Sequence, residues 1–331
     1  MSDTVASLRR KIDSAGTLQA VVRTMKALAA SSIGQYEQSV RALGDYYRVV
    51  ELGLGVCIRS TSPAALTTGA EGRTGSGAIG AVVFGSDQGL VGQFNDVVAE
   101  HAASTLEGPT DRPQIWAVGE RVHARLKDAG LPPIGLFAVP SSVKAITPLV
   151  GRILVESEVR RSRGEIVELH LFYNRPTSGA VYEPVDQRLL PLDDAWQRER
   201  AQLAWPTKNL PEVMGGDSGT LRALIREYLF VSLFRACAES LASENASRLA
   251  AMQRADRNID ELLVDLNGSF HRRRQGGIDE ELFDVISGFE ALAREGGKAA
   301  GEERRRAESR LARSREASDT ARTGLVRGSS G

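Results

Sequence analysis

Two long segments of the chain carry apolar and small residues at a helical spacing. In residues 5–56 the stripe makes fourteen steps over 49 residues, and in residues 221–293 a second stripe makes thirteen steps over 46 residues. A mean step near 3.5 residues is typical of a left-handed coiled coil, not of a straight helix on a sheet. The first stripe comprises Val5, Leu8, Ile12, Ala15, Leu18, Val22, Met25, Ala29, Ser32, Tyr36, Val40, Leu43, Tyr47, Val50 and Leu54; the second comprises Leu224, Tyr228, Val231, Phe234, Ala238, Leu241, Asn245, Arg248 or Leu249, Met252, Ala255, Ile259, Leu262, Leu266 and Phe270.

The prolines separate these segments from the middle of the chain. All 12 lie between Pro63 and Pro211, so both periodic segments lack the residue that breaks helix interiors. Neither helix can bury its stripe alone, and we expect the two to pair, antiparallel, as a coiled coil. A helix of roughly 70 residues is ~100 Å long at 1.5 Å per residue, which exceeds the width of a compact domain. The alternative, in which each helix packs separately on a globular core, stays open.

The middle of the chain alternates strand and helix patterns. The continuous apolar run AIGAVVFGS (78–86) predicts a buried strand, and PQIWAV and IGLFAV predict two more. We expect helices between them, one capped by Asn95, one in GERVHARLKDAG, and one that opens at Thr147 and Pro148. EIVELHLFYN alternates and should form a hairpin with AVYEPV. This order predicts a partly parallel, Rossmann-like sheet.

The sequence therefore predicts an α/β protein in which a long antiparallel two-helix coiled coil, formed by the N- and C-terminal segments, carries a Rossmann-like α/β head. We divide the chain into an N-terminal coiled-coil helix (1–60), a linker (61–77), the head (78–211), a C-terminal coiled-coil helix (212–292) and a charged, disordered tail (293–331). Part of that tail, GEERRRAESRLARSREASD, has a helical composition.

Charge and composition narrow the classes of function. Lys plus Arg and Asp plus Glu number 42 each, so net charge gives no reason to expect nucleic acid as a partner. The balance conceals an excess of four positive charges in residues 293–331. The N-terminus lacks the apolar core of a signal peptide, and no run of ~18 apolar residues occurs, so we expect a cytoplasmic protein that does not span a membrane.

We find no pattern that predicts an active site, a metal site or a cofactor. Cys57 and Cys237 have no zinc spacing and are expected to be buried thiols, and the four histidines are expected at the surface. The segment GSDQGLVGQFND (85–96) follows a strand, where phosphate loops lie, but it lacks the P-loop spacing and lysine. We interpret it as a turn in which Gly89 and Gly92 supply positive φ angles.

Four stretches resemble one known family. VVRTMKALAASS (21–32), FGSDQGLVGQFN (84–95), ESLASENASRLAAMQRADRN (239–258) and RQGGIDEELFDVISGFEAL (274–292) are similar, in order, to motifs of the gamma subunit of F-type ATP synthases, the central rotor shaft. The resemblance implies an antiparallel coiled coil inside a ring of three alpha and three beta subunits. It places the head against the epsilon subunit and the membrane c-ring, and the catalytic residues on beta.

The resemblance also implies a role and a location. One copy per complex would couple ion-driven c-ring rotation to conformational change in the catalytic ring, as a peripheral protein at the cytoplasmic face of the bacterial inner membrane. By motif position, Arg274 and Gln275 correspond to a contact with a beta catch loop. Met25 and Arg248 correspond to residues that face one another and the ring near its lower opening, and Asp87 lies in a loop facing the bottom of the ring. With Met25 opposite Arg248, Cys237 is expected near residue 36, too far from Cys57 for a disulfide.

The chain also departs from the family pattern. Ser32 replaces the usual lysine, Val91 the usual cysteine, and Gly276–Gly277 better helix formers, while 39 residues follow Leu292, where the family usually ends. Residues 21–37 also look like the alternative, sodium-linked N-type ATPases. Two other functions stay open from the residues: a Rossmann-like nucleotide-binding protein with coiled-coil oligomerisation arms, and a homodimeric coiled-coil scaffold.

Overall fold

The computed structural model describes residues 4–60, 77–107, 112–178, 181–209, 211–213 and 217–324. Its elements are α1 (Val5–Ser60), β1 (Ala78–Phe84), α3 (Phe94–Leu106), β2 (Gln114–Val118), α4 (Glu120–Asp128), β3 (Gly135–Phe137), α5 (Val143–Ser162), β4 (Ile166–Arg175), β5 (Glu183–Leu190), α6 (Asp194–Ala201) and α7 (Asp217–Gly324). They form two compact units, one of residues 17–259 and one of residues 1–16 with 260–331.

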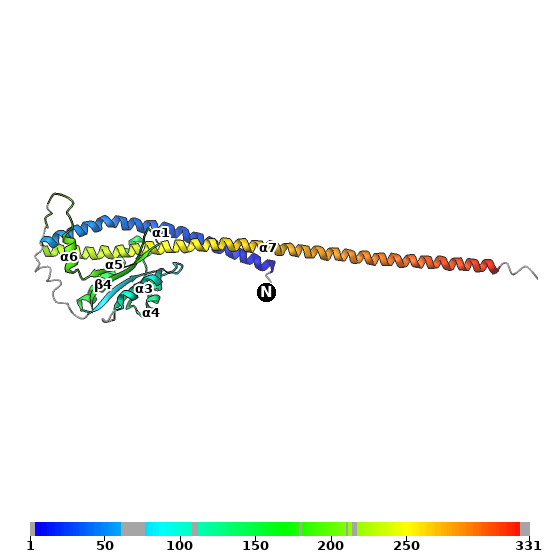
Figure 1. Ribbon diagram of the computed structural model, residues 1–331, viewed down its shortest axis with the longest axis horizontal. Helices are drawn as coiled ribbons and strands as arrows, with labels where there is room; N and C mark the ends of the chain where they lie inside the picture. The colour runs from blue at the N-terminus through cyan, green and yellow to red at the C-terminus, as the bar shows by residue number, and fades with distance from the viewer. Residues whose placement is uncertain are drawn as a thin grey trace, which may run out of the picture. The chain divides into compact units, whose positions relative to one another are not determined.

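The first unit contains a five-stranded mixed sheet in the order β3-β2-β1-β4-β5. Strands β3, β2, β1 and β4 are parallel to one another, and β4 and β5 form the expected antiparallel hairpin. Alternate residues of β1 point into different cores, which explains its continuous apolar sequence. Val82 and Phe84 join a core shared with α1, α5 and α7, whereas Ala81 and Val83 join a core shared with α3 and α4 (Figure 1). The predicted Rossmann-like head is confirmed.

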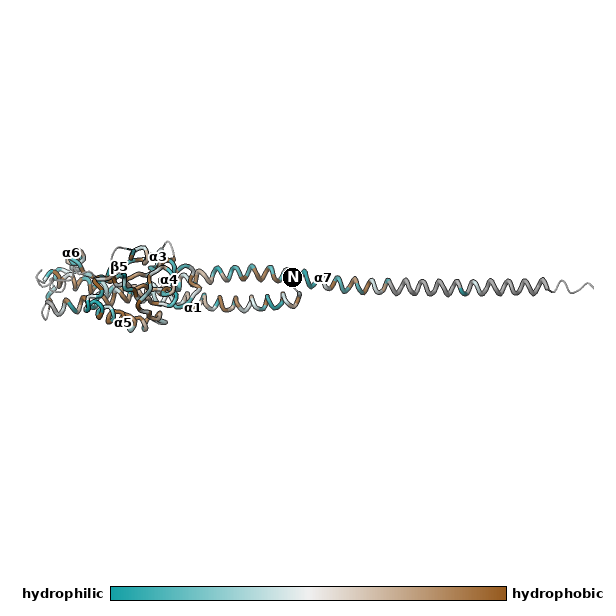
Figure 2. Tube along the Cα trace, turned by 90° about the horizontal axis from the view of Figure 1, so that it is seen from below, coloured by the Kyte–Doolittle hydropathy of each residue, from teal (hydrophilic) through white to brown (hydrophobic). Residues whose placement is uncertain are grey.

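Within this unit, α1 and α7 run side by side in both views (Figure 1, Figure 2). Arg23 Nε and Lys26 Nζ, early in α1, lie 3.1 and 2.8 Å from the carboxylate oxygens of Asp256, late in α7. At the other end, the rings of Tyr47 and Tyr228 are 5.8 Å apart between centroids. Because rising numbers in α1 meet falling numbers in α7, the pairing is antiparallel, as predicted.

Val5, the first residue of α1, is 36% exposed, and the predicted seam is wrong at two further positions. Leu18 is 60% exposed, and the half-buried Gln19 takes its place. Leu262 is 49% exposed, and the half-buried Leu263 takes its place. A heptad seam advances by alternating steps of three and four residues. After Ala15 and after Ile259 the structure takes a step of four, whereas the sequence analysis took a step of three to reach an apolar residue.

Three predicted helix boundaries also differ from the structure. Helix α3 is capped by Gln93, not Asn95, whose side chain is buried in the first turn. Helix α5 begins at Val143 and contains Pro148, because buried apolar residues such as Ile146 extend its packed face toward the N-terminus. Helix α7 continues to Gly324, past residue 292 and into the segment expected to be disordered. The division of the chain into five parts stays a prediction, and its linker lies outside the described residues except for Gly77.

The cysteines and one histidine complete the comparison with the sequence. Cys57 and Cys237 are both buried, and neither forms a disulfide bond. Burial raises the pKa of Tyr36, and the charges of Glu244 and then of Cys237 add to the shift, so Tyr36 lies near Cys237 as expected. His170 is not on the surface as expected: its side chain is 14% exposed, with Nδ1 2.9 Å from Asp186 Oδ1 and Nε2 3.1 Å from Glu168 Oε2.

The contacts of His170 predict a pH-dependent contribution to stability. The hydrogen bond to Asp186 is the largest cause of the raised pKa of His170, whose ordinary value is 6.5, while burial opposes the rise. A raised folded-state pKa gives stability that is fully present below the unfolded-state value and is lost as pH rises through the folded-state value. We expect His170→Gln to lower the free energy of unfolding by roughly 1–2 kcal/mol below pH 6 and by less at pH 8. Urea unfolding across this range measures the difference. The exposed His271→Gln is the control, and an effect of His170→Gln that does not change with pH would contradict the assignment.

Candidate functional site: the loop after β1 and its contact with α7

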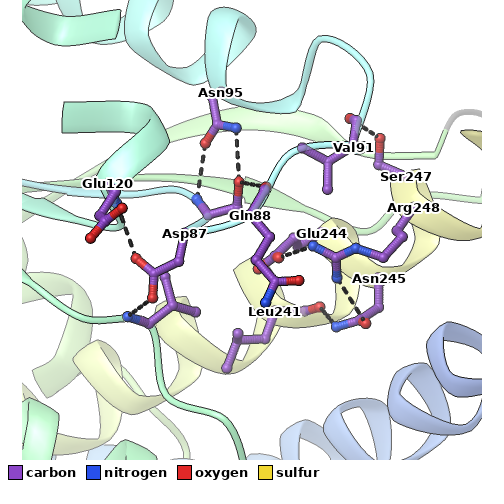
Figure 3. A network of polar contacts seen from close by, with 12 residues as sticks. Asp87, Gln88, Val91, Asn95, Glu120, Leu241, Glu244, Asn245, Ser247 and Arg248 are labelled. Atoms are coloured by element: carbon purple, nitrogen blue, oxygen red, sulfur yellow. Dashed lines mark hydrogen bonds and ion pairs between the residues drawn. The ribbon is translucent and has the colours of Figure 1, made fainter. Parts of the chain in front are cut away.

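The loop that joins β1 to α3 (residues 85–93, here the Ser86 loop) is fixed by two buried polar side chains. Ser86 is fully buried, and its backbone N–H donates to Asn95 Oδ1 at 2.9 Å. Asn95 Nδ2 donates to Ser86 Oγ at 2.9 Å, and Ser86 Oγ donates to the carbonyl of Gln88 at 2.9 Å (Figure 3). This reciprocal pair replaces the predicted helix cap, and it couples the start of α3 to the end of β1.

Asp87 joins the carboxyl ends of three strands. Its Oδ1 accepts from Glu120 N–H at 3.0 Å, at the start of α4, and its Oδ2 accepts from Val139 N–H at 2.9 Å, just after β3 (Figure 3). Both carboxylate oxygens are therefore used inside the head. The positive φ angles of the loop fall at Leu90 (64°) and Gly92 (58°), so the prediction for Gly92 is confirmed and that for Gly89 is wrong.

The far end of the Ser86 loop contacts α7 and β4. Ser247 Oγ donates to the carbonyl of the buried Val91 at 2.5 Å. Asn174 Nδ2, at the end of β4, donates to the carbonyl of Phe94 at 2.9 Å. The contact with α7 therefore includes a hydrogen bond between the carbonyl of Val91 and the side chain of Ser247, which is 156 residues away in sequence.

Beneath the loop, α7 carries a largely buried ion pair. Arg248 Nη2 lies 2.5 Å from Glu244 Oε1, and the two side chains are 13% and 7% exposed. Arg248 Nη1 also donates to Asn245 Oδ1 at 3.3 Å, while Asn245 Nδ2 donates to the carbonyl of Leu241 at 2.8 Å. Burial raises the pKa of Glu244, Arg248 opposes the rise, and the charge of Asp87 adds to it. Figure 3 shows Asp87 and Gln88 beside this pair.

The structure thus brings together two of the five residues selected from the sequence. Asp87 and Arg248 both act on Glu244, which the sequence analysis did not select. Met25 is half-buried on α1 in the same unit, and Arg274 and Gln275 are exposed on α7 in the other unit. The omitted residues Ser86, Glu244 and Ser247 gain their roles from contacts between distant parts of the chain, and no local spacing signals them. Within the part of the chain that the structure describes, no group of three His, Cys, Asp or Glu side chains could hold a metal ion.

Comparisons with known proteins identify the class to which this arrangement belongs. The sequence pattern of the ATP synthase family matches residues 4–292. The ATP synthase gamma chain of Clavibacter sepedonicus is 30% identical over 86% of this chain and 96% of its own length. That of Sorangium cellulosum is 28% identical over 86% of this chain and 98% of its own length.

Solved structures share the fold at low identity. The rotor of the Euglena gracilis mitochondrial ATP synthase superposes with a TM-score of 0.55 at 17% identity, covering 83% of this chain and 98% of that one. A second structure of that synthase, containing OSCP, F1 and the c-ring, gives a TM-score of 0.57 at 17% identity over 87% of this chain and 94% of that one.

The chain belongs to the ATP synthase family. Within it, the curated relatives are gamma chains, and the chain is a central-stalk subunit of an F-type ATP synthase, part of a membrane-associated complex. Among the residues that the structure describes, none of the helices combines the length and apolarity that a membrane crossing requires.

Proposed function

We propose that this chain couples rotation of a membrane c-ring to conformational change in a ring of three alpha and three beta subunits. One copy turns inside that ring, with its head against the epsilon subunit and the c-ring, at the cytoplasmic face of a bacterial inner membrane. The observation that carries this proposal is the match to gamma chains over residues 4–292, which spans both long helices and the head. Each beta subunit would contact a different face of the turning helices, so rotation shifts the nucleotide affinity of each site.

The contact between the Ser86 loop and α7 supports this function mechanically. Torque applied to the head is transmitted to α7 only if the head does not shift relative to this helix. Apolar packing resists separation but specifies lateral position weakly, whereas the hydrogen bond from Ser247 to Val91 fixes both distance and direction. Because Asp87 already accepts two backbone N–H groups, we propose that it acts by holding the loop rather than by contacting the ring directly.

The nucleotide-binding alternative is not favoured by this geometry. In open α/β sheets, ligands bind outside the carboxyl ends of the strands, where the strand order reverses. Here that position, next to β1, holds the Ser86 loop, and Asp87 occupies the N–H group of Glu120 at the start of α4. The head uses these groups for internal contacts and for its junction with α7.

We propose that Arg274 and Gln275 contact a beta subunit and that Met25 and Arg248 lie near the lower opening of the ring. Arg274 and Gln275 are both exposed on α7 and supply hydrogen-bond donors. Replacing both with alanine is expected to reduce ATP-driven ion pumping of the assembled enzyme by about tenfold, because charge-assisted hydrogen bonds that transmit torque are lost.

The measurement is ion transport per ATP hydrolysed, in the assembled enzyme reconstituted into vesicles. Arg273→Ala removes the same side chain one position around the helix, and it should keep normal coupling. Equal coupling in the double variant and the control would exclude the contact at Arg274 and Gln275. Failure of the chain to copurify with alpha and beta subunits would instead exclude the proposed function as a whole.

A further inference from the structure

The short helix α6 contacts both long helices in the first unit, near the end of α1 and the start of α7 (Figure 1). It has 8 residues and follows closely after β5, which ends at Leu190. Its first turn is fixed by Asp193, whose Oδ1 accepts from Trp196 N–H at 2.9 Å. Helix α6 therefore connects the edge of the sheet to the helix pair.

The contact of α6 with α1 is ionic and very close. Arg200 Nη2 lies 3.2 Å from Glu51 Oε1, and the two side chains are 16% and 17% exposed. Arg59 Nη1 donates to the carbonyl of Ala201, the last residue of α6, at 2.6 Å. A Cβ atom on Gly55 would lie 2.5 Å from the carbonyl oxygen of Arg200, so a larger residue would push the two helices apart. A movement of α1 along its axis would break these contacts together.

The contact of α6 with α7 is aromatic. Trp196 Nε1 donates to Tyr228 Oη at 3.2 Å, and the two rings meet edge to face with their centroids 5.1 Å apart. Tyr228 is buried. The guanidinium group of Arg200 lies over the Trp196 ring, 5.6 Å from its centroid. The same two side chains of α6 therefore contact each other, α1 and α7.

The apolar seam alone specifies the register of α1 and α7, their relative position along the helix axes, only weakly. A heptad seam repeats every seven residues, so a slide of one repeat brings apolar positions opposite one another again. Asp256 also joins the two helices, but its partners Arg23 and Lys26 are 57% and 36% exposed, and exposed ion pairs contribute little. The contacts of α6 are more buried, so they should contribute more to the register.

We propose that α6 fixes the register of α1 and α7, and that Glu51, Trp196 and Arg200 are positioning residues for rotary coupling. Two parallel helices slide past one another when the pair bends, as the layers of a bent beam do. In the proposed function each beta subunit contacts a different face of the turning helices, so the load on them is uneven and bends the pair. Helix α6 resists the sliding, and the pair then transmits rotation instead of deforming. This consequence rests on the proposed function, whereas the register itself is a property of the first unit.

Spin-label distances in the assembled enzyme test whether α6 fixes the register. Labels are attached to cysteines introduced by Gln38→Cys in α1 and Arg222→Cys in α7, at two exposed positions. Because Tyr47 contacts Tyr228, Arg222 lies opposite residue 53, and the labels are offset by roughly 20 Å along the pair. A slide of one repeat changes this offset by about 10 Å.

The Glu51→Gln, Trp196→Phe double variant removes the ion pair and the indole N–H and keeps the aromatic ring. The fraction of molecules with a displaced label distance should rise about tenfold, because two interactions that hold the register are lost. The same variant should transport fewer ions per ATP hydrolysed while it still hydrolyses ATP. A change that only weakened folding would lower both activities together and leave their ratio unchanged.

A matched double variant, Glu199→Gln with Trp205→Phe, makes the same chemical changes without touching either long helix. Trp205 Nε1 donates to Thr207 Oγ1 at 3.1 Å, two residues away. Glu199 Oε1 lies 3.5 Å from Arg200 Nη1, but it belongs to α6 itself. This variant should keep the native label distance and the native ratio of ions transported to ATP hydrolysed.

Gly55→Ala tests the same contact without removing a polar group. Its Cβ should push α6 away from α1 and displace the label distance, whereas Gly44→Ala, where a Cβ meets nothing within 4 Å, should not. A native label distance in both Gly55→Ala and the Glu51→Gln, Trp196→Phe variant would overturn the role of α6 in the register. A displaced distance with a normal transport ratio would overturn the positioning role. Failure of the proposed function would appear separately, as loss of the chain from the purified enzyme.

Discussion

Replacing Gly119 with alanine is expected to lower the free energy of unfolding by roughly 3–5 kcal/mol, because it combines backbone strain with a steric clash. Gly119 lies between β2 and α4 at φ 118°, a conformation that L side chains rarely adopt. A Cβ atom there would lie 2.7 Å from the carbonyl oxygen of Ser86 and 2.9 Å from its backbone nitrogen. These are backbone atoms held by Asn95 and Arg121, so they cannot move without breaking the loop.

Gly130 provides the matched control for this experiment. It also has a positive φ angle, 78°, but an added Cβ would meet no atom within 4 Å. Gly130→Ala should therefore cost only the backbone strain, about 1 kcal/mol. Urea unfolding of both variants measures the difference, and assembly of the Gly119→Ala chain with its partner subunits should fall in parallel. Equal losses for the two variants would mean that the approach of Ser86 to Gly119 is not a tight constraint.

The head could be predicted well because its signals are local. The run in β1 is apolar on both faces since two cores meet there, and the hairpin of β4 and β5 follows from neighbouring segments. The Ser86 loop could not be predicted, because its hydrogen bonds join distant residues. Asp87 and Val139 are 52 residues apart, and Val91 and Ser247 are 156 apart. Asn95 shows the consequence: a residue type that commonly caps helices is used instead to hold Ser86.

The coiled coil was predictable from its period and not from the identity of each residue. The mean step of 3.5 residues predicted that the two helices pair. Selecting an apolar residue at each step, however, chose Leu18 and Leu262, which are exposed. Asp256 is a second example, since an aspartate is rarely buried unless it is paired. In the structure it is 9% exposed, because Lys26, the largest cause of its lowered pKa, and Arg23 reach it from α1. Whether such a residue is buried depends on the side chains that reach it from the partner helix. The sequence of one helix alone does not contain this information.

Replacing Arg248 with methionine is expected to destabilise the chain by roughly 3–5 kcal/mol, because it leaves the buried carboxylate of Glu244 without its partner. Methionine keeps much of the length and apolar contact of the arginine stem, so the lost charge and hydrogen bonds dominate. Adding Glu244→Gln should recover most of the loss, since a neutral amide needs no cation beside it. Urea unfolding of the two single variants and the double variant completes this cycle.

The pH dependence of the Arg248→Met variant separates loss of charge from loss of packing. The pKa of Glu244 is already raised by burial, and Arg248 opposes the rise, so removing Arg248 raises this pKa further. A folded state with the higher carboxyl pKa binds protons more tightly than the unfolded state, so its stability falls as pH rises through that range. The loss caused by Arg248→Met should therefore be largest at pH 7 and shrink toward pH 5, as Glu244 takes up a proton. A loss that is constant between these values, or that persists in full with Glu244→Gln, would show that Arg248 stabilises α7 by packing alone.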